Sequence, residues 1–544
     1  MAALIAMAVW LRTPLPALRE QLKALQFWSL EICLAAVLAF GSLVVRDLWL
    51  RLHRGDVIRM ASLAVAALAL TLFVAPRTNR IYYDEQIYQS IGRNLSDLKL
   101  AQMCNDGTVE YGRLQCWMGE YNKQPYAYPH LLSLLYRAFG VSEAVAFVCN
   151  AVINALTVAA VYLLVVILFA DRAAAFFASL LMLLTPQQLL WSATAAVEPS
   201  ASLACVAAVL CAAAFRDSRT TVSLVATCAA AAYAAQFRPE SFLIVPVVGL
   251  MLWPPASREM GGTRVWTVAL LFFVLIAVDV AHMYVVRNEG WGTTDARLSF
   301  GYVLANLRVN GRFYLGDGRF PLVFTLLAIV GLLGASRQSE RWCLGVYFFL
   351  FFGIFLLFYA GSYNYGADVR YSLMTYPPIA MLGGLGASAL VAWLARIRPR
   401  WPATASLTGL LVFQFLWYAP AVRATSEEAW AARTDVRFAK SMVPQLSGNS
   451  YVLTHNPGMF HVWGVNAGQM SLIVTNPDHV KFLAGRYAEG VYLHWNFWCN
   501  VQDPVQRGFC QKALEGRPVE IVREYRERDQ RYAFYRFRIG PPQN

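Results

Sequence analysis

The chain has 544 residues, of which 58% are hydrophobic and only 15% are charged. Soluble globular domains carry about 25% charged residues, so this composition excludes an ordinary soluble protein and predicts a polytopic membrane protein. The formal net charge is +13, but there is no Lys/Arg-rich run and no aromatic-basic RNA signature. We therefore assign the excess charge to cytoplasmic loops and exclude a nucleic-acid partner.

Apolar segments recur along most of the chain. A membrane-spanning helix needs roughly 20 apolar residues, or somewhat fewer inside a bundle. Twelve segments qualify, at about 27–45, 57–75, 143–169, 173–192, 195–215, 221–237, 241–253, 265–286, 321–336, 343–361, 371–395 and 402–420. The segment 241–253 is short for a full span. Residues 1–26 are compatible with either an interfacial amphipathic helix or an additional partial span.

Arginine predicts the orientation of these segments. One set of alternate connections is short and arginine-rich, with Arg46, Arg51, Arg54, Arg59, Arg172, Arg216, Arg219, Arg258, Arg264, Arg337, Arg341, Arg396, Arg398 and Arg400. The positive-inside rule makes these connections cytoplasmic. The loops 76–142 and 287–320 and the tail after residue 420 would then lie outside the cytoplasm.

The tail differs in composition from the rest of the chain. Helix-like stretches at 425–446 and 503–515 alternate with the strand-like runs "SYVLT" (450–454), "MSLIVT" (470–475), "GVYLHW" (490–495) and "RYAFYRFRI" (531–539). Such alternation predicts a small α/β domain. We therefore expect a transmembrane domain over 1–420 and an extracytoplasmic α/β domain over 421–544.

Four cysteines fall in the segments predicted to lie outside, and they form two close pairs. Cys104 and Cys116 lie in the loop 76–142, and Cys499 and Cys510 lie in the tail. Close pairs on the outer side suit disulfides in an oxidising compartment, although four free thiols remain the alternative. The spacing within each pair does not match a CxxC metal motif.

Ionisable residues gather where the predicted topology places the outer membrane face. Each has a structural alternative: Glu198 precedes Pro199 and suits a helix N-terminus, Arg238 and Glu240 could form an interfacial ion pair, and Arg370 could be an interfacial anchor. Together they indicate a functional site, because an ionisable group at membrane depth needs a cavity and a partner. The set comprises Asp84, Glu85, Lys123, Glu198, Arg238, Glu240, Arg370 and the adjacent Tyr371.

Several of these residues lie in motifs that resemble a known superfamily. "YYDEQIYQSIGRNL" (82–95) resembles the first-loop acidic motif of GT-C glycosyltransferases, in the branch of protein O-mannosyltransferases and the lipid A aminoarabinose transferase. "NKQPYAYPHLLSLLYRAFG" (122–140) resembles the motif that follows it, and "EPSASL", "FRPES" and "DVRYSLMTYPP" resemble short motifs seen through the superfamily. The resemblance covers roughly 57–395, in order. It implies a GT-C fold with about 12 transmembrane helices.

The resemblance also implies a reaction. Such enzymes pass a sugar from a polyprenyl-phosphate donor to an extracytoplasmic glycan, lipid or protein acceptor, with inversion, and a bacterial inner membrane is the expected location. By resemblance Asp84 is the general base, while Glu85 orients it, binds the acceptor or assists a metal. Lys123, Arg238, Arg370 and Tyr371 would bind the donor phosphate, and Glu198 and Glu240 would orient the cations.

One departure from the family pattern bears on a cofactor. The aminoarabinose transferase subgroup has an acid before the lysine and a proline directly after it, whereas Asn122 and Gln124 occupy these positions here. The metal-linked neighbours are therefore replaced, and a divalent metal ion remains an open question for this chain.

Two other functions compete with this interpretation. A ligase that moves a whole lipid-linked glycan normally lacks adjacent acids in its first long loop. A transporter or flippase of lipid-linked sugars normally shows internal repeats and polar residues at the bilayer midplane, and we detect neither pattern. We therefore favour the membrane glycosyltransferase.

Overall fold

The computed structural model describes residues 12–81, 83–253, 262–289, 293, 295–364, 368–397, 399–425, 430–501 and 503–538. The chain forms two compact units. The first comprises Met1–Arg77, Lys123–Ala127 and Phe147–Glu427, and the second comprises Thr78–Asn122, Tyr128–Ala146 and Glu428–Asn544.

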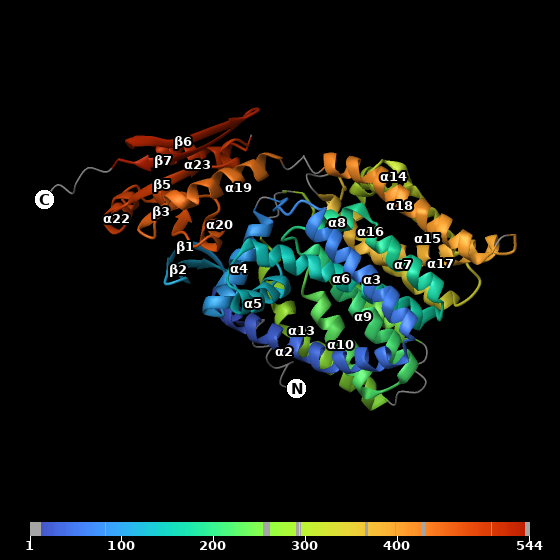
Figure 1. Ribbon diagram of the computed structural model, residues 1–544. Helices are drawn as coiled ribbons and strands as arrows, with labels where there is room; N and C mark the ends of the chain where they lie inside the picture. The colour runs from blue at the N-terminus through green and yellow to red at the C-terminus, as the bar shows by residue number, and fades with distance from the viewer. Residues whose placement is uncertain are drawn as a thin grey trace. The chain divides into compact units, whose positions relative to one another are not determined.

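The first unit is a helical bundle (Figure 1). Its 3-10 turns are η1 (Pro239–Leu243), η2 (Phe300–Tyr302) and η3 (Asp368–Thr375). Its helices are α2 (Leu15–Arg51), α3 (Arg54–Phe73), α6 (Glu143–Phe169, which begins in the second unit), α7 (Arg172–Leu183), α8 (Pro186–Trp191), α9 (Glu198–Ser218), α10 (Thr221–Ala235), α11 (Ile244–Leu252), α13 (Gly262–Val286), α14 (Val303–Gly316), α15 (Leu322–Leu332), α16 (Gln338–Leu357), α17 (Tyr376–Leu394) and α18 (Arg400–Thr425).

The apolar helices identify an integral membrane protein. Within the described residues, eight helices are long and apolar enough to cross a bilayer, and four more are apolar but shorter. Each of the twelve predicted segments overlaps one of them. Large apolar side chains such as Ile32 and Val65 are exposed on the bundle, at 62% and 65%, as expected for surfaces that face lipid. Helix α2 runs without a break from Leu15 to Arg51, so residues 15–26 belong to the same helix as the first predicted span. The part of the 1–26 prediction that covers 1–11 lies outside the described residues.

Glycines allow two helices of the bundle, α15 and α17, to approach each other closely. A Cβ atom at Gly386 in α17 would lie 2.0 Å from the carbonyl oxygen of Leu327 in α15, and one at Gly331 in α15 would lie 1.8 Å from the carbonyl oxygen of Leu382. Small residues allow helix backbones to approach this closely in membranes. Helices α15 and α17 therefore pack backbone to backbone (Figure 1).

The second unit is built on a seven-stranded mixed sheet, with strand order β2-β1-β4-β3-β5-β7-β6. Strand β3 pairs in parallel with β4 and β5, and the other neighbours are antiparallel. The first two strands come from the 76–142 loop and the rest from the tail. The strands are β1 (Met103–Glu110), β2 (Arg113–Glu120), β3 (Ser450–Thr454), β4 (Ala467–Gln469), β5 (Gly490–Trp495), β6 (Val519–Glu527) and β7 (Gln530–Phe537).

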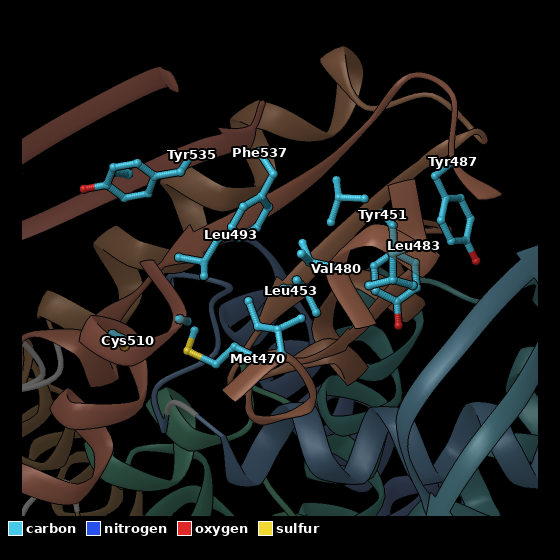
Figure 2. Packing of buried hydrophobic residues seen from close by; sticks show 14 of the residues in the cluster. Tyr451, Leu453, Met470, Val480, Leu483, Tyr487, Leu493, Cys510, Tyr535 and Phe537 are labelled. Atoms are coloured by element: carbon cyan, nitrogen blue, oxygen red, sulfur yellow. The ribbon is translucent and has the colours of Figure 1, made fainter. Parts of the chain in front are cut away.

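Alternating side chains give the sheet two apolar faces. Leu453, Leu493 and Phe537 join a cluster with residues of α21 (Ser471–Thr475), α22 (His479–Arg486) and α23 (Pro504–Leu514), and Figure 2 shows this layer. The intervening residues Val452 and Phe534 join a second cluster with α19 (Trp430–Met442) and α20 (Pro457–Val462). The period of two places neighbouring residues on opposite faces, so helices cover both sides of the sheet.

The two remaining helices of this unit come from the segments before and after the β1–β2 hairpin. They are α4 (Asp84–Leu98) and α5 (Ala127–Phe139). The Arg93 guanidinium of α4 donates to the carbonyl oxygen of His461, in α20 of the tail. Together with strands β1 and β2, this contact makes most of the 76–142 loop and the tail parts of one compact unit.

Most of the secondary structure predicted for the tail is confirmed. Strands β3, β5 and β7 and helices α19 and α23 lie where the sequence predicts them. The prediction for 470–475 is wrong, because Ser471–Thr475 forms the short helix α21 with Ile473 buried in the core. Burial against the sheet outweighs the β preference of this short run.

Both predicted disulfides are present. Cys104–Cys116 links β1 to β2, and Cys499–Cys510 links the 3-10 turn η6 (Phe497–Cys499) to α23. In each pair the Cα atoms lie 5.7 Å apart, within the range that a disulfide requires. The other six cysteines are buried thiols.

Candidate functional site

Four ionisable side chains meet inside the first unit. Glu198 is the first residue of α9, Arg238 precedes η1, Glu240 lies within η1, and Arg370 lies in η3. Arg238 forms ion pairs with both Glu198 and Glu240. The Nε atom of Arg370 lies 3.3 Å from the same Oε1 atom of Glu198. One carboxylate oxygen therefore holds two arginines, and we call these four residues the arginine cluster.

The arginine cluster is largely withdrawn from solvent. The side chain of Glu198 is fully buried, and those of Arg370, Glu240 and Arg238 are 8%, 10% and 11% exposed. The second carboxylate oxygen of Glu198 is also buried and accepts no hydrogen bond from the residues that the structure describes. Burying charges this deeply is costly and gives little net stability, so a functional role explains the cluster better.

Tyr371 gives the cluster an aromatic side. The guanidinium carbons of Arg238 and Arg370 lie 5.3 and 5.2 Å from the centre of its ring. The ring also stacks on Phe355 of α16, with ring centres 4.5 Å apart. These contacts fall within cation–π distance and help to fix both arginines.

The two adjacent acids lie in the second unit, at the start of α4, and they have different environments. Glu85 is fully buried, and its Oε1 atom accepts hydrogen bonds from the backbone N–H groups of Arg80 and Ile81, at 2.7 and 2.9 Å. Asp84 is the first helical residue and is only half-buried. Glu85 therefore fixes the conformation of the preceding loop. Asp84 is the more accessible acid of the pair.

The residue before Asp84 has an unusual backbone. Tyr83 has φ 92° and ψ −58°, outside the regions that a bulky residue normally adopts. Its backbone N–H donates to Gln86 Oε1 at 2.8 Å, and its ring makes an edge contact with Trp498 of η6, with ring centres 6.4 Å apart. Burial and the charges of Glu120 and Asp84 raise the pKa of Tyr83 to about 12. Strained residues of this kind concentrate at functional sites.

Lys123 lies in the 123–127 segment of the first unit, and its side chain is half-buried. The ring of His282, in α13, hydrogen-bonds the Lys123 backbone. His282 also contacts Tyr126, with ring centres 5.1 Å apart, and the Ala127 N–H donates to Gln236 O at 3.3 Å. The segment carrying Lys123 is thus anchored on two apolar helices.

The structure brings together five of the predicted site residues: Glu198, Arg238, Glu240, Arg370 and Tyr371. Asp84 and Glu85 belong to the other compact unit. Sequence reasoning missed His282 and Phe355. His282 carried a usable signal, since an ionisable residue inside an apolar segment is itself a functional hypothesis. Phe355 is one of many aromatic residues in its segment, so no sequence signal distinguished it.

Solved structures share this arrangement of helices and sheet. ArnT from Cupriavidus metallidurans bound to undecaprenyl phosphate is 14% identical, with a TM-score of 0.55 over 89% of this chain and 98% of that one. The Archaeoglobus fulgidus oligosaccharyltransferase is 11% identical, with a TM-score of 0.50 over 87% of this chain and 74% of that one. The chain has the GT-C fold. The GT-C fold accounts for the apolar bundle and the C-terminal sheet together.

Sequence comparisons match only part of the chain. A family model described as dolichyl-phosphate-mannose-protein mannosyltransferase matches residues 123–282, less than half of the chain. No curated protein sequence matches the chain significantly. The region matched by this family model contains Lys123, Glu198, Arg238 and Glu240.

Proposed function

We propose that this protein is a membrane glycosyltransferase that transfers a sugar from a polyprenyl-phosphate donor to an acceptor outside the cytoplasm. The observation that carries this proposal is the buried arginine cluster inside a GT-C bundle. The ArnT structure of the same fold was solved with undecaprenyl phosphate, which supports a lipid-phosphate donor. The arginine-rich connections support a site on the extracytoplasmic face of a bacterial inner membrane.

The cations suit a phosphate leaving group. As the bond between the anomeric carbon and the phosphate oxygen breaks, negative charge grows on the phosphate, and fixed cations stabilise it. Arg238 and Arg370 are held by Glu198 and Tyr371 and can offer paired N–H donors. Lys123 is the third proposed phosphate-binding cation. The second oxygen of Glu198 is available to a sugar hydroxyl.

Asp84 suits the role of general base. The acceptor hydroxyl loses its proton to a carboxylate while its oxygen attacks the anomeric carbon, and a single displacement of this kind inverts that carbon. Asp84 is the first residue of α4, where an acidic side chain suits the helix dipole. Glu85 positions the loop through its two backbone hydrogen bonds and therefore supports Asp84 without moving a proton.

The described residues around Asp84 include no group of three histidine, cysteine or carboxylate metal ligands. The one described group of three histidine, cysteine or carboxylate ligands is His455, Cys499 and Cys510, in which the two cysteines are joined as a disulfide. One oxygen of Glu85 is already engaged by two backbone donors. The proposed mechanism therefore includes no metal step.

The first experiment tests Asp84 directly. Purified protein would be reconstituted with a panel of polyprenyl-phosphate sugars, and release of polyprenyl phosphate would be measured. We expect Asp84→Asn to lower turnover by at least about 100-fold, the usual contribution of a general base. Asp47→Asn, at an acid that is 58% exposed, is the control and should stay within twofold. Near-normal turnover of Asp84→Asn would remove this residue from the mechanism.

The archaeal oligosaccharyltransferase likeness makes transfer of a whole lipid-linked glycan the second candidate. Mass spectrometry of envelope glycans, lipids and proteins from cells with and without the chain separates the two. A product heavier by one sugar supports the proposal, and a product heavier by an oligosaccharide supports the ligase. The same spectra identify the sugar and the acceptor.

A further inference from the structure

A cavity of about 670 Å³ opens in the second unit, where α22, the residues after α23 and the end of β7 meet. Four cationic and two anionic side chains line it: Lys481, Lys512, Arg517, Arg538, Asp478 and Glu515. The lining therefore has an excess of positive charge. None of these residues belongs to the proposed transferase site.

Arg517 is held rigidly at this cavity. Its Nη1 atom donates to the carbonyl oxygens of Lys512 and Ala513, at 2.8 and 3.0 Å, and its Nη2 atom donates to that of Ile473 at 2.7 Å. A guanidinium has five N–H donors, so two remain for a ligand. The carbonyl groups carry only partial negative charge, and no carboxylate among the described residues pairs with Arg517.

The other cations differ in how far their charge is neutralised. Lys481 pairs with Asp478 at 3.0 Å, and Arg538 pairs with Glu520 at 3.5 Å. The ammonium group of Lys512 has no ion-pair partner within the described part of the chain. The net attraction for an anion therefore comes mainly from Arg517 and Lys512, opposed by Glu515.

The remaining lining is apolar. Val480 and Phe537 are buried residues of the cluster in Figure 2, and Val474 packs against the same cluster. An anion alone would leave this apolar floor uncovered. The cavity therefore fits a ligand in which an oxyanion is attached to an apolar or ring-shaped body.

The cavity is separate from the loop of Asp84. Strand β5 starts at Gly490 and ends at Trp495, just before η6, whose Trp498 contacts Tyr83. Phe537, at the cavity, is the last residue of β7 and lies four residues beyond Ala533, which pairs with Trp495. The four residue steps from Ala533 to Phe537 span about 13 Å at the usual rise of a strand. The cavity and the Asp84 loop therefore lie at opposite ends of the central strands.

We propose that this cavity is a binding site for a small ligand that carries a phosphate or carboxylate group on an apolar or ring-shaped body. Arg517 and Lys512 bind the oxyanion, and Val480 and Phe537 contact the body. The site goes beyond the proposed transferase reaction, since it uses none of the residues assigned to that reaction.

The test uses the full-length protein in neutral detergent at low salt. Binding of inorganic phosphate, phenyl phosphate, glucuronate and neutral glucose would be measured by isothermal titration. We expect phenyl phosphate or glucuronate to bind more tightly than inorganic phosphate, and glucose to show no binding. Equal binding of glucose and of the anions would overturn the proposal.

Variants locate the site. Lys512→Gln should weaken anion binding up to about fivefold through the loss of an exposed ion pair, and Glu515→Gln should tighten it at least twofold by removing repulsion. Arg507→Gln is the matched control, since Arg507 is exposed on the same helix and does not line the cavity. Arg517→Lys should abolish binding but could also loosen the end of α23. The Lys512 variant is therefore the decisive test, because Lys512 is exposed and its substitution leaves the fold intact. Unchanged binding in Lys512→Gln, or an equal loss in Arg507→Gln, would refute the assignment.

Discussion

At the scale of single residues, the main feature is a carboxylate shared by two arginines. Glu198 Oε1 contacts both Arg238 and Arg370, and Glu240 contacts Arg238 as well. The two positive charges are thus compensated before any ligand arrives, which makes their burial tolerable. The donor phosphodiester proposed to enter the cluster carries one negative charge, which becomes two as the sugar leaves, and it would share these cations with the glutamates. The cluster can therefore hold its shape while it binds and releases a charged group.

This arrangement predicts a specific effect of Arg370→Gln. We expect the KM for the lipid-phosphate sugar to rise at least 10-fold, because a hydrogen bond to a charged group contributes about 1.5–3 kcal/mol. Arg337→Gln is the control, since Arg337 is 58% exposed before α16 and outside the cluster. Donor titrations of the reconstituted variants measure both. Equal effects of the two substitutions would contradict a donor-phosphate role for Arg370.

At the scale of elements, the bundle depends on glycine where α15 and α17 cross. The glycines at 331 and 386 leave no room for a side chain, since in each case a carbonyl oxygen of the facing helix occupies the Cβ position. Helix α17 follows directly after η3, which carries Arg370 and Tyr371. Correct packing of α17 therefore helps to set the position of two residues of the proposed site.

Alanine substitution at two glycines tests this packing. Gly386→Ala should destabilise the protein by roughly 1–3 kcal/mol, as overpacking does in other cores. Gly409→Ala, in α18, should be neutral or stabilising, because a Cβ atom there meets nothing within 4 Å and alanine favours the helix. Thermal unfolding in one detergent compares the two variants. A similar melting shift in both would show that α15 and α17 do not pack as closely as described.

The same scale shows what the sequence could and could not predict. Apolar length located the helices, and close cysteine pairs located both disulfides, since these are local signals. The pairing of Gly107 with Ala467 joins strands far apart in the chain, and no local pattern encodes such a contact. The gathering of Glu198, Arg238 and Arg370 was predictable because all three lie at helix ends on one predicted face. That both arginines contact the same carboxylate oxygen of Glu198 could be learned only from the three-dimensional structure.

At the scale of the whole molecule, the residues proposed for the reaction belong to two different compact units. The bundle holds the arginine cluster, while the unit built on the mixed sheet holds Asp84 at the start of α4. Strands from the 76–142 loop complete the sheet of the tail, so folding of the Asp84 loop is coupled to folding of the tail. Conditions that unfold the tail should therefore also disturb this loop.

Acid is one such condition, because burial lowers the pKa of two histidines of the second unit. Burial lowers the pKa of His455 and of His461 to about 4, from an ordinary value of 6.5. Both are therefore neutral in the folded unit, and the unfolded chain binds more protons between these values. The stability that they support is complete above about pH 6.5 and is lost as the pH falls towards 4.

We therefore expect the second unit to lose up to a few kcal/mol of stability between pH 7 and pH 4.5, because a tenfold difference in proton affinity between the folded and unfolded chain corresponds to about 1.4 kcal/mol. Hydrogen exchange of peptides from β3 and β5, corrected for intrinsic rates, should show faster opening at the lower pH, and peptides from α17 should change less. His461→Gln keeps a side-chain donor near the Ala467 carbonyl that the ring contacts at 2.9 Å, and it should flatten part of this dependence. If β3 and β5 open equally fast at both pH values, buried histidines do not control the stability of the unit that carries Asp84.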